Sequence, residues 1–126
     1  MKMLKLPQIK KMHPFMFVGL ENNHNNPAIS SIVNSVVNVT GIEFSKIQSI
    51  TRKREILYAR HLFCYFARKR TKLSFKEIGD ILNRDHATVL HSVNTVKDLL
   101  TYDRDFIEIV PQIENKIGEY ERLEST

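Results

Sequence analysis

The sequence predicts an all-α fold, a bundle of about five to six helices, and three observations support it. From residue 28 onward, apolar residues recur three and four positions apart, which is the spacing of one helix face. No stretch carries the alternation of apolar and polar residues that predicts a β-strand. The 126 residues contain only four glycines and four prolines, so few positions are forced to turn, and the length suits one domain.

Residues 1–27 show no sustained periodicity and end in the polar run "ENNHNNP". We expect an irregular, poorly ordered arm here, followed by one domain over residues 28–126. Prolines and charged residues interrupt the apolar stretches of the arm, which argues against a secretory signal, and no apolar run is long enough to cross a membrane. The lone cysteine, Cys64, allows no disulfide within the chain and indicates the cytoplasm.

The first two helices are predicted on either side of Gly41. Pro27 suits the first position of a helix whose N-cap is Asn26, and Gly41 ends the segment. The valines of this segment are also common in strands, but their spacing is helical. The run "EFSKIQ" predicts one short helix.

The longest predicted helix spans residues 51–70 and has basic residues at both ends. Its apolar stripe consists of Ile56, Ala59, Phe63, Phe66 and Ala67. The basic residues are Arg52, Lys53 and Arg54 at its start, and Arg68, Lys69, Arg70 and Lys72 at its end.

Two further helices are predicted to meet at a tight turn. Ser74 and Glu77 form a capping-box pattern at the start of a short helix that ends near Leu82. Asp85 is a suitable N-cap for the next helix, which is predicted to run to about Tyr102 with its valines on the core side. This spacing predicts a helix-turn-helix, in which the second helix offers its first turns to the DNA major groove.

The C-terminal half of the chain divides into a basic and an acidic block. Residues 51–102 carry 11 Lys and Arg against 5 Asp and Glu, whereas residues 103–126 carry 3 against 7. The basic block favours an anionic partner, nucleic acid first, although a solvated lysine-rich surface would have the same composition. A last helix is predicted after Asp105, and Pro111 should either kink or restart it.

The run "TRKREILYARHLFCYFARKRTKLSFKEIGDILNRDHATVLHSV" resembles the C-terminal DNA-binding domain of the bacterial chromosomal replication initiator DnaA. That family has a basic loop, a long helix opening with an arginine, a Leu-Ser-x-x-x-Ile-Gly run and a closing Arg-Asp-His-Thr-Thr-Val-x-His signature. The counterparts here are Arg52–Arg54, Arg60, "LSFKEIG" at Leu73–Gly79, and "RDHATVLH" at Arg84–His91. The resemblance covers roughly residues 29–116. It implies a TrpR-like helix-turn-helix that binds double-stranded DNA at DnaA-box-like sites, in replication initiation or its regulation.

Three departures from the family pattern bear on this expectation. The sequence contains no GxxxxGK[ST] loop, so it predicts no nucleotide-binding site, and the ATP-driven activities of the family are not implied. Ala87 stands where the signature has its first threonine, which predicts a different preferred DNA sequence. The turn before Arg84 is "LN", where the family has two glycines after an aromatic residue, so the recognition helix is expected to be tilted.

The resemblance assigns expected roles residue by residue. Base contacts are expected from Arg52 in the minor groove, and from Asp85, His86, Ala87 and His91 in the major groove. Contacts to the DNA backbone are expected from Lys53, Arg54, Arg60, Ser74, Arg84, Thr88, Asn94 and Lys97. Some alternatives stay open: Arg52 could be a solvated loop residue, Arg60 could pair with an acidic side chain, and Asp85 could act only as a cap.

Other classes of function are weighed against DNA binding. His86 and His91 are five positions apart, which places their imidazoles about 140° apart around a helix and argues against a metal pair. No catalytic residue, metal or cofactor is therefore predicted. Two alternatives remain: a transcriptional regulator of a mobile element or phage, and an interaction module for an acidic protein. A replication or regulatory protein partner and a place at the nucleoid are also expected.

Overall fold

The structure is a computed structural model that describes residues 26–124, and the regular secondary structure within this range consists of helices alone. The expectation of a poorly ordered arm falls almost wholly on residues 1–25, which lie outside the described range. The six helices are α1 (Pro27–Thr40), α2 (Phe44–Ile47), α3 (Arg54–Arg70), α4 (Phe75–Leu82), α5 (His86–Leu99) and α6 (Arg104–Glu124). The all-α, helix-turn-helix prediction is confirmed.

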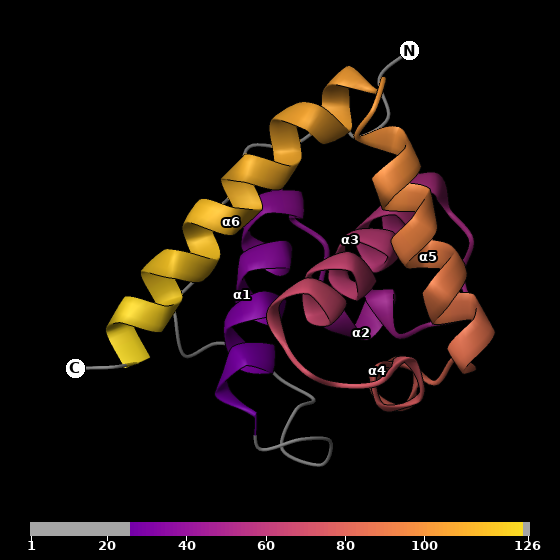
Figure 1. The fold of residues 1–126 in the computed structure, drawn as a ribbon, viewed down its shortest axis with the longest axis horizontal. Coiled ribbons are helices and arrows are strands. Elements are labelled where there is room, and N and C mark those ends of the chain that lie inside the picture. The colour runs from indigo at the N-terminus through magenta and orange to yellow at the C-terminus, as the bar shows by residue number, and fades with distance from the viewer. Residues whose placement is uncertain (1–25, 125–126) are drawn as a thin grey trace.

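The helices pack around α3, whose neighbours are α1 on one side and α5 on the other (Figure 1). The long α6 lies along α1, and α4 packs against the N-terminal part of α5. One apolar core joins them, and its largest fully buried side chains include Phe63, Phe66 and Phe106. This core holds α4, α5 and the start of α3 in fixed relation to one another.

The start and the end of α1 follow the capping signals of the sequence. The Asn26 side chain accepts a hydrogen bond from the Ala28 amide at 2.9 Å, with Pro27 in the first turn. Gly41 ends α1 in the left-handed conformation, at φ 75°, where a side chain would be strained. The helix α2 also forms as predicted. These local rules therefore set the limits of α1.

Two predicted helix limits differ from the structure, and one of the two alternatives predicted at Pro111, a restarted helix, is excluded. The helix α3 starts at Arg54 rather than Thr51, because the residues before it are held in a loop by side-chain hydrogen bonds. The helix α5 ends at Leu99, and turns follow it to Tyr102. The helix α6 does not restart at Pro111 but continues through it. Its buried apolar face, packed on α1, offsets the one helical hydrogen bond that proline cannot donate.

Candidate nucleic-acid interface

The turn between α4 and α5 is built for close approach of the two helices. Ser74 and Glu77 form the predicted capping box, with hydrogen bonds of 3.1 and 2.8 Å. Asn83 ends α4 in the left-handed region at φ 59°, a conformation that asparagine tolerates better than most residues. A Cβ on Gly79 would lie 2.3 Å from the Arg84 carbonyl oxygen. The helix-turn-helix therefore depends on a glycine at position 79.

The first turns of α5 present polar side chains to solvent. The Asp85 carboxylate caps the helix by accepting from the Thr88 amide at 2.8 Å. Hydrogen bonds from the Thr88 hydroxyl and amide lower the pKa of Asp85 below its ordinary value, so the cap stays ionised at neutral pH. His86 and Ala87 are exposed beside it. These are the side chains that a major groove would meet first.

The rest of α5 divides cleanly into two faces. Val89, Val93 and Val96 are buried in the core, as their spacing predicted. The opposite, solvent-facing side carries Thr88, Leu90, His91, Asn94 and Lys97. Leu90, which is 41% exposed, also lies on this side, and it was not among the residues predicted from the sequence. Its position outside the valine edge, three residues after Ala87, was the signal that could have identified it.

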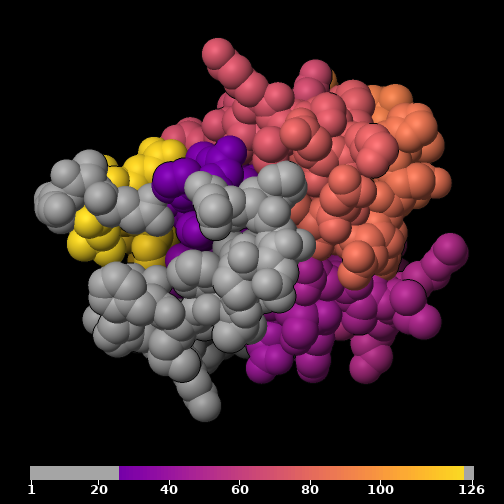
Figure 2. All heavy atoms as spheres, turned by 90° about the horizontal axis from the view of Figure 1, so that it is seen from below, coloured from indigo at the N-terminus to yellow at the C-terminus, as the bar shows by residue number. Residues whose placement is uncertain are grey.

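The α2–α3 loop is fixed by two arginines that meet at one carbonyl group. Arg60 donates from Nε to the Ile47 carbonyl at 2.7 Å, and from one terminal nitrogen to the carbonyls of Ser49 and Thr51 at 2.9 and 3.2 Å. Arg84, from the α4–α5 turn, donates to the same Ser49 carbonyl. Two elements far apart in sequence are thereby tied together, and they lie side by side in Figure 2 as the magenta and salmon regions.

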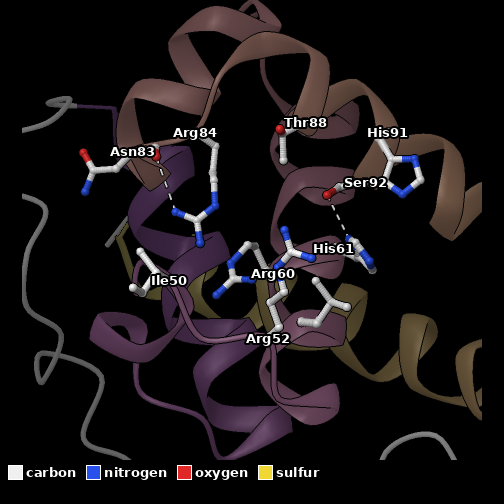
Figure 3. Close-up of a pocket in the computed structure, with 10 residues that line it drawn as sticks. Ile50, Arg52, Arg60, His61, Asn83, Arg84, Thr88, His91 and Ser92 are labelled. Carbon is white, nitrogen blue, oxygen red and sulfur yellow. Dashed lines mark hydrogen bonds between the residues drawn. The ribbon is translucent and has the colours of Figure 1, made fainter.

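A hollow of about 590 Å³ lies between this loop and the start of α5 (Figure 3). The hollow is lined by Ile50, Arg52, Leu57, Arg60, His61, Asn83, Arg84, Thr88, His91 and Ser92. None of these lining residues is acidic, although three of them are arginines. Desolvation and the neighbouring Arg84 guanidinium lower the pKa of Arg60 from its ordinary value, as expected for cations held close together. An anion in the hollow would relieve this repulsion.

His61 forms part of the floor of the hollow. Its Nδ1 lies 2.8 Å from the Ser92 hydroxyl oxygen, and the side chain is buried. Burial, and then the proximity of His91 and Arg60, lowers the pKa of His61 from 6.5 to about 4. His61 is therefore neutral at pH 7 and links α3 to α5 as a structural group.

The basic cluster at the other end of α3 is compensated within the chain. Lys69 pairs with Glu114 at 2.6 Å and Arg70 with Glu121 at 3.2 Å, so the acidic α6 covers this cluster. Arg68 lies over the Phe75 ring, 4.4 Å from its centroid, and donates to the Leu73 carbonyl. Of the two basic clusters of the predicted helix, the one at its end is therefore partly compensated by glutamates of α6.

The structure places the predicted contact residues in three groups. Around the hollow lie Arg52, Arg60, Arg84, Thr88 and His91. Asp85, His86 and Ala87 stand at the exposed start of α5, with Asn94 and Lys97 farther along the helix. Ser74 caps α4, while Lys53 and Arg54 are exposed at the start of α3.

Arg60 differs most from its expected environment. Only 3% of it is exposed, and its hydrogen bonds go to loop carbonyls rather than to an acidic side chain. Over residues 26–124, no group of three or more His, Cys, Asp or Glu side chains could hold a metal ion. No helix in the same range is both long and apolar enough to span a membrane.

Comparison with known proteins identifies the family. The family model described as "Bacterial dnaA protein helix-turn-helix" matches residues 29–96, more than half of the chain. The chain belongs to this DnaA helix-turn-helix family. The match covers α1 to most of α5, and so includes the loop, the hollow and the turn. The α6 helix lies beyond it.

Relatives named chromosomal replication initiator protein DnaA resemble the chain over about three quarters of its length. The protein of Flavobacterium psychrophilum is 38% identical over 100 residues, which are 79% of this chain and 21% of that protein. The protein of Bacteroides thetaiotaomicron is 37% identical over 97 residues, and that of Borrelia hermsii 33% over 98, covering 76% and 77% of this chain and 21% and 20% of those proteins. The chain thus spans about a fifth of the length of these DnaA proteins.

Proposed function

We propose that this chain binds double-stranded DNA sequence-selectively, at a DnaA-box-like site, in replication initiation or its regulation. The observation that carries the proposal is the carboxylate-free hollow between two exposed elements, the α2–α3 loop and the start of α5. A duplex has one sugar–phosphate strand between its major groove and the adjacent minor groove. With α5 in the major groove and Arg52 in the minor groove, that strand would cross the hollow.

The proposed base contacts are those of the two exposed elements. Arg52 would enter an A·T-rich minor groove, where the negative potential is concentrated. In the major groove, the Asp85 carboxylate could accept from a cytosine amino group, and Ala87 could contact a thymine methyl group. His86 and His91 complete the proposed set.

Backbone contacts are proposed from Lys53, Arg54, Ser74, Arg84, Thr88, Asn94 and Lys97. Arg60 is proposed instead as a positioning residue, because its donors are used to hold the loop that carries Arg52. In this proposal the chain has no catalytic role of its own. We also propose that it acts at the nucleoid with a replication or regulatory protein partner.

The proposal is tested by selecting duplexes from a random library at one salt concentration, with the wild type and two variants. His86→Ala should weaken binding to the best site by roughly 1–3 kcal/mol and hardly change binding to random duplex, because base contacts discriminate. Ala87→Thr should shift the consensus toward sites of DnaA proteins that carry threonine there. If all three proteins select the same consensus and prefer it over random DNA by the same factor, the side chains of α5 do not contact bases.

Salt dependence provides an independent test. If about 4 to 6 phosphates are contacted, the logarithm of the binding constant should fall against the logarithm of salt concentration with a slope of roughly −4 to −5. Lys53→Ala should reduce the slope by about one, since one phosphate contact is lost. The control is Lys116→Ala, because Lys116 lies on α6 and pairs with Glu119. A slope near zero for the wild type would exclude nucleic-acid binding.

A further inference from the structure

Ile50 lies at the tip of the α2–α3 loop and is 90% exposed, although its neighbours on the rim of the hollow are cationic. We propose that Ile50 is a specificity-determining residue that packs against base edges and sugars of the DNA minor groove beside Arg52. This inference rests on the proposed function and extends it. It predicts that the chain rejects a guanine amino group at the base pair that Ile50 covers.

The exposure of Ile50 does not serve the stability of the fold. Among the large hydrophobic residues that the structure describes, the others with exposed side chains are between 41% and 71% exposed. An isoleucine that remains in water after folding gains almost none of the free energy of apolar burial. A polar residue would serve equally well at position 50 if the loop had no partner.

The loop that presents Ile50 is held on both sides of it. The carbonyls of Ser49 and Thr51, the residues directly before and after it, accept hydrogen bonds from Arg60, and Ser49 also accepts from Arg84. The Gln48 side-chain amide donates to the Ile81 carbonyl of α4 at 2.7 Å. A side chain presented in this way loses little backbone freedom on binding, so its contact costs less entropy.

Ile50 and Arg52 are two residues apart on the α2–α3 loop, and both line the hollow (Figure 3). If Arg52 enters the minor groove, Ile50 on the same loop reaches that groove as well. Minor-groove proteins use isoleucine among the apolar side chains that they press against base steps. At A·T pairs the groove floor offers only acceptor atoms, but at G·C pairs the guanine 2-amino group projects into it. An isoleucine against that group would crowd it and leave its hydrogen unpaired.

The experiment uses inosine to isolate the amino group. An inosine·cytosine pair matches guanine·cytosine in the major groove but lacks the minor-groove amino group. The selected duplex is therefore prepared with G·C or I·C pairs in the segment that faces the loop. Wild type should bind the I·C duplex about tenfold more tightly, a ratio equivalent to about 1.4 kcal/mol.

Ile50→Ala should reduce the ratio between the two duplexes to within about twofold of unity. It should also weaken binding to the selected site about tenfold with an unchanged salt slope, because no charge is removed. Ile107→Ala is the matched control, since Ile107 is an isoleucine on α6 that is 45% exposed and outside the hollow. It should leave both the ratio and the affinity unchanged. Urea unfolding of Ile50→Ala should match that of the wild type, because the side chain is 90% exposed.

Two results would overturn the inference while leaving the proposed function in place. In the first, Ile50→Ala binds the selected site as tightly as the wild type and keeps the same I·C to G·C ratio. Ile50 would then contact a protein partner rather than DNA. The other is an equal loss on selected and random duplexes with an altered salt slope, which would mean that the loop has moved. If the wild type selects no duplex, the proposed function fails and this inference fails with it.

Discussion

Gly79→Ala is expected to destabilise the protein and to displace α5, the second helix of the helix-turn-helix. The added Cβ would stand 2.3 Å from the Arg84 carbonyl oxygen and 3.4 Å from that of Asp85. Because contacts under 3.0 Å are essentially never adopted, the backbone of the turn must move by about 1 Å. The move strains the 2.8 Å hydrogen bond from the Arg84 amide to the Gly79 carbonyl.

The magnitude follows from two opposing terms. Overpacking at a rigid site costs about 1–3 kcal/mol, whereas replacing glycine by alanine inside a helix contributes about 0.5–1 kcal/mol of stability. We therefore expect a net loss of about 1–2 kcal/mol in the free energy of unfolding. Gly118→Ala provides a control with the opposite sign, since the nearest atom to its added Cβ is a terminal nitrogen of Arg122 at 3.6 Å.

Urea unfolding followed by circular dichroism measures both variants. With a slope of about 1–3 kcal/mol per molar urea for a small protein, the two midpoints should differ by about 1 M, with Gly79→Ala the lower. DNA binding gives a second readout, because a displaced α5 should lose preference for its best site before it loses affinity for random duplex. A midpoint for Gly79→Ala equal to or above that of Gly118→Ala would refute the close-approach argument.

Three further substitutions test the groups around the hollow. Arg84→Lys keeps the charge for a backbone contact but cannot reproduce the contacts of the guanidinium with Ser49 and the turn, so preference for the selected site should fall while the salt slope stays constant; an unchanged preference would mean that these contacts do not position the loop and α5. Arg52→Ala should lose more affinity on sites with A·T flanks than on those with G·C flanks, and equal losses would make Arg52 a backbone contact. His61 takes up its proton near pH 6.5 when unfolded but only near 4 when folded, so stability should fall by up to about 3 kcal/mol between these pH values. Urea midpoints at pH 7 and 4.5 should show a weaker pH dependence in His61→Gln, and identical dependence would contradict this assignment.

Local sequence signals predicted the helix starts well because each depends on a few neighbouring atoms. The Asn26 cap, the Ser74 capping box and the Asp85 cap all form as expected. The apolar spacing of α5 likewise identified which valines face the core. Such signals need no knowledge of the rest of the fold.

Residues whose partners lie far along the chain could not be predicted in this way. Arg60 looked like an exposed cation, but its acceptors belong to the loop 9 to 13 residues before it. The start of α3 was missed for the same reason, since the Thr51 carbonyl accepts a hydrogen bond from Arg60 instead of from a helix amide, whereas its end at Arg70 was predicted correctly. Pro111 was expected either to kink or to restart the last helix, and tertiary packing carries the helix through it without a restart.

Charge shows most clearly what folding adds to composition. Residues 51–102 carry a net charge of +6, and this number alone does not say where an anion would bind. In the structure, Glu114 and Glu121 of α6 pair with Lys69 and Arg70 at the end of α3. The hollow at the other end is lined by arginines without a carboxylate. A helix beyond the family match thus compensates part of one basic cluster, whereas the lining of the hollow combines three arginines with no carboxylate, a composition that favours an anionic partner there.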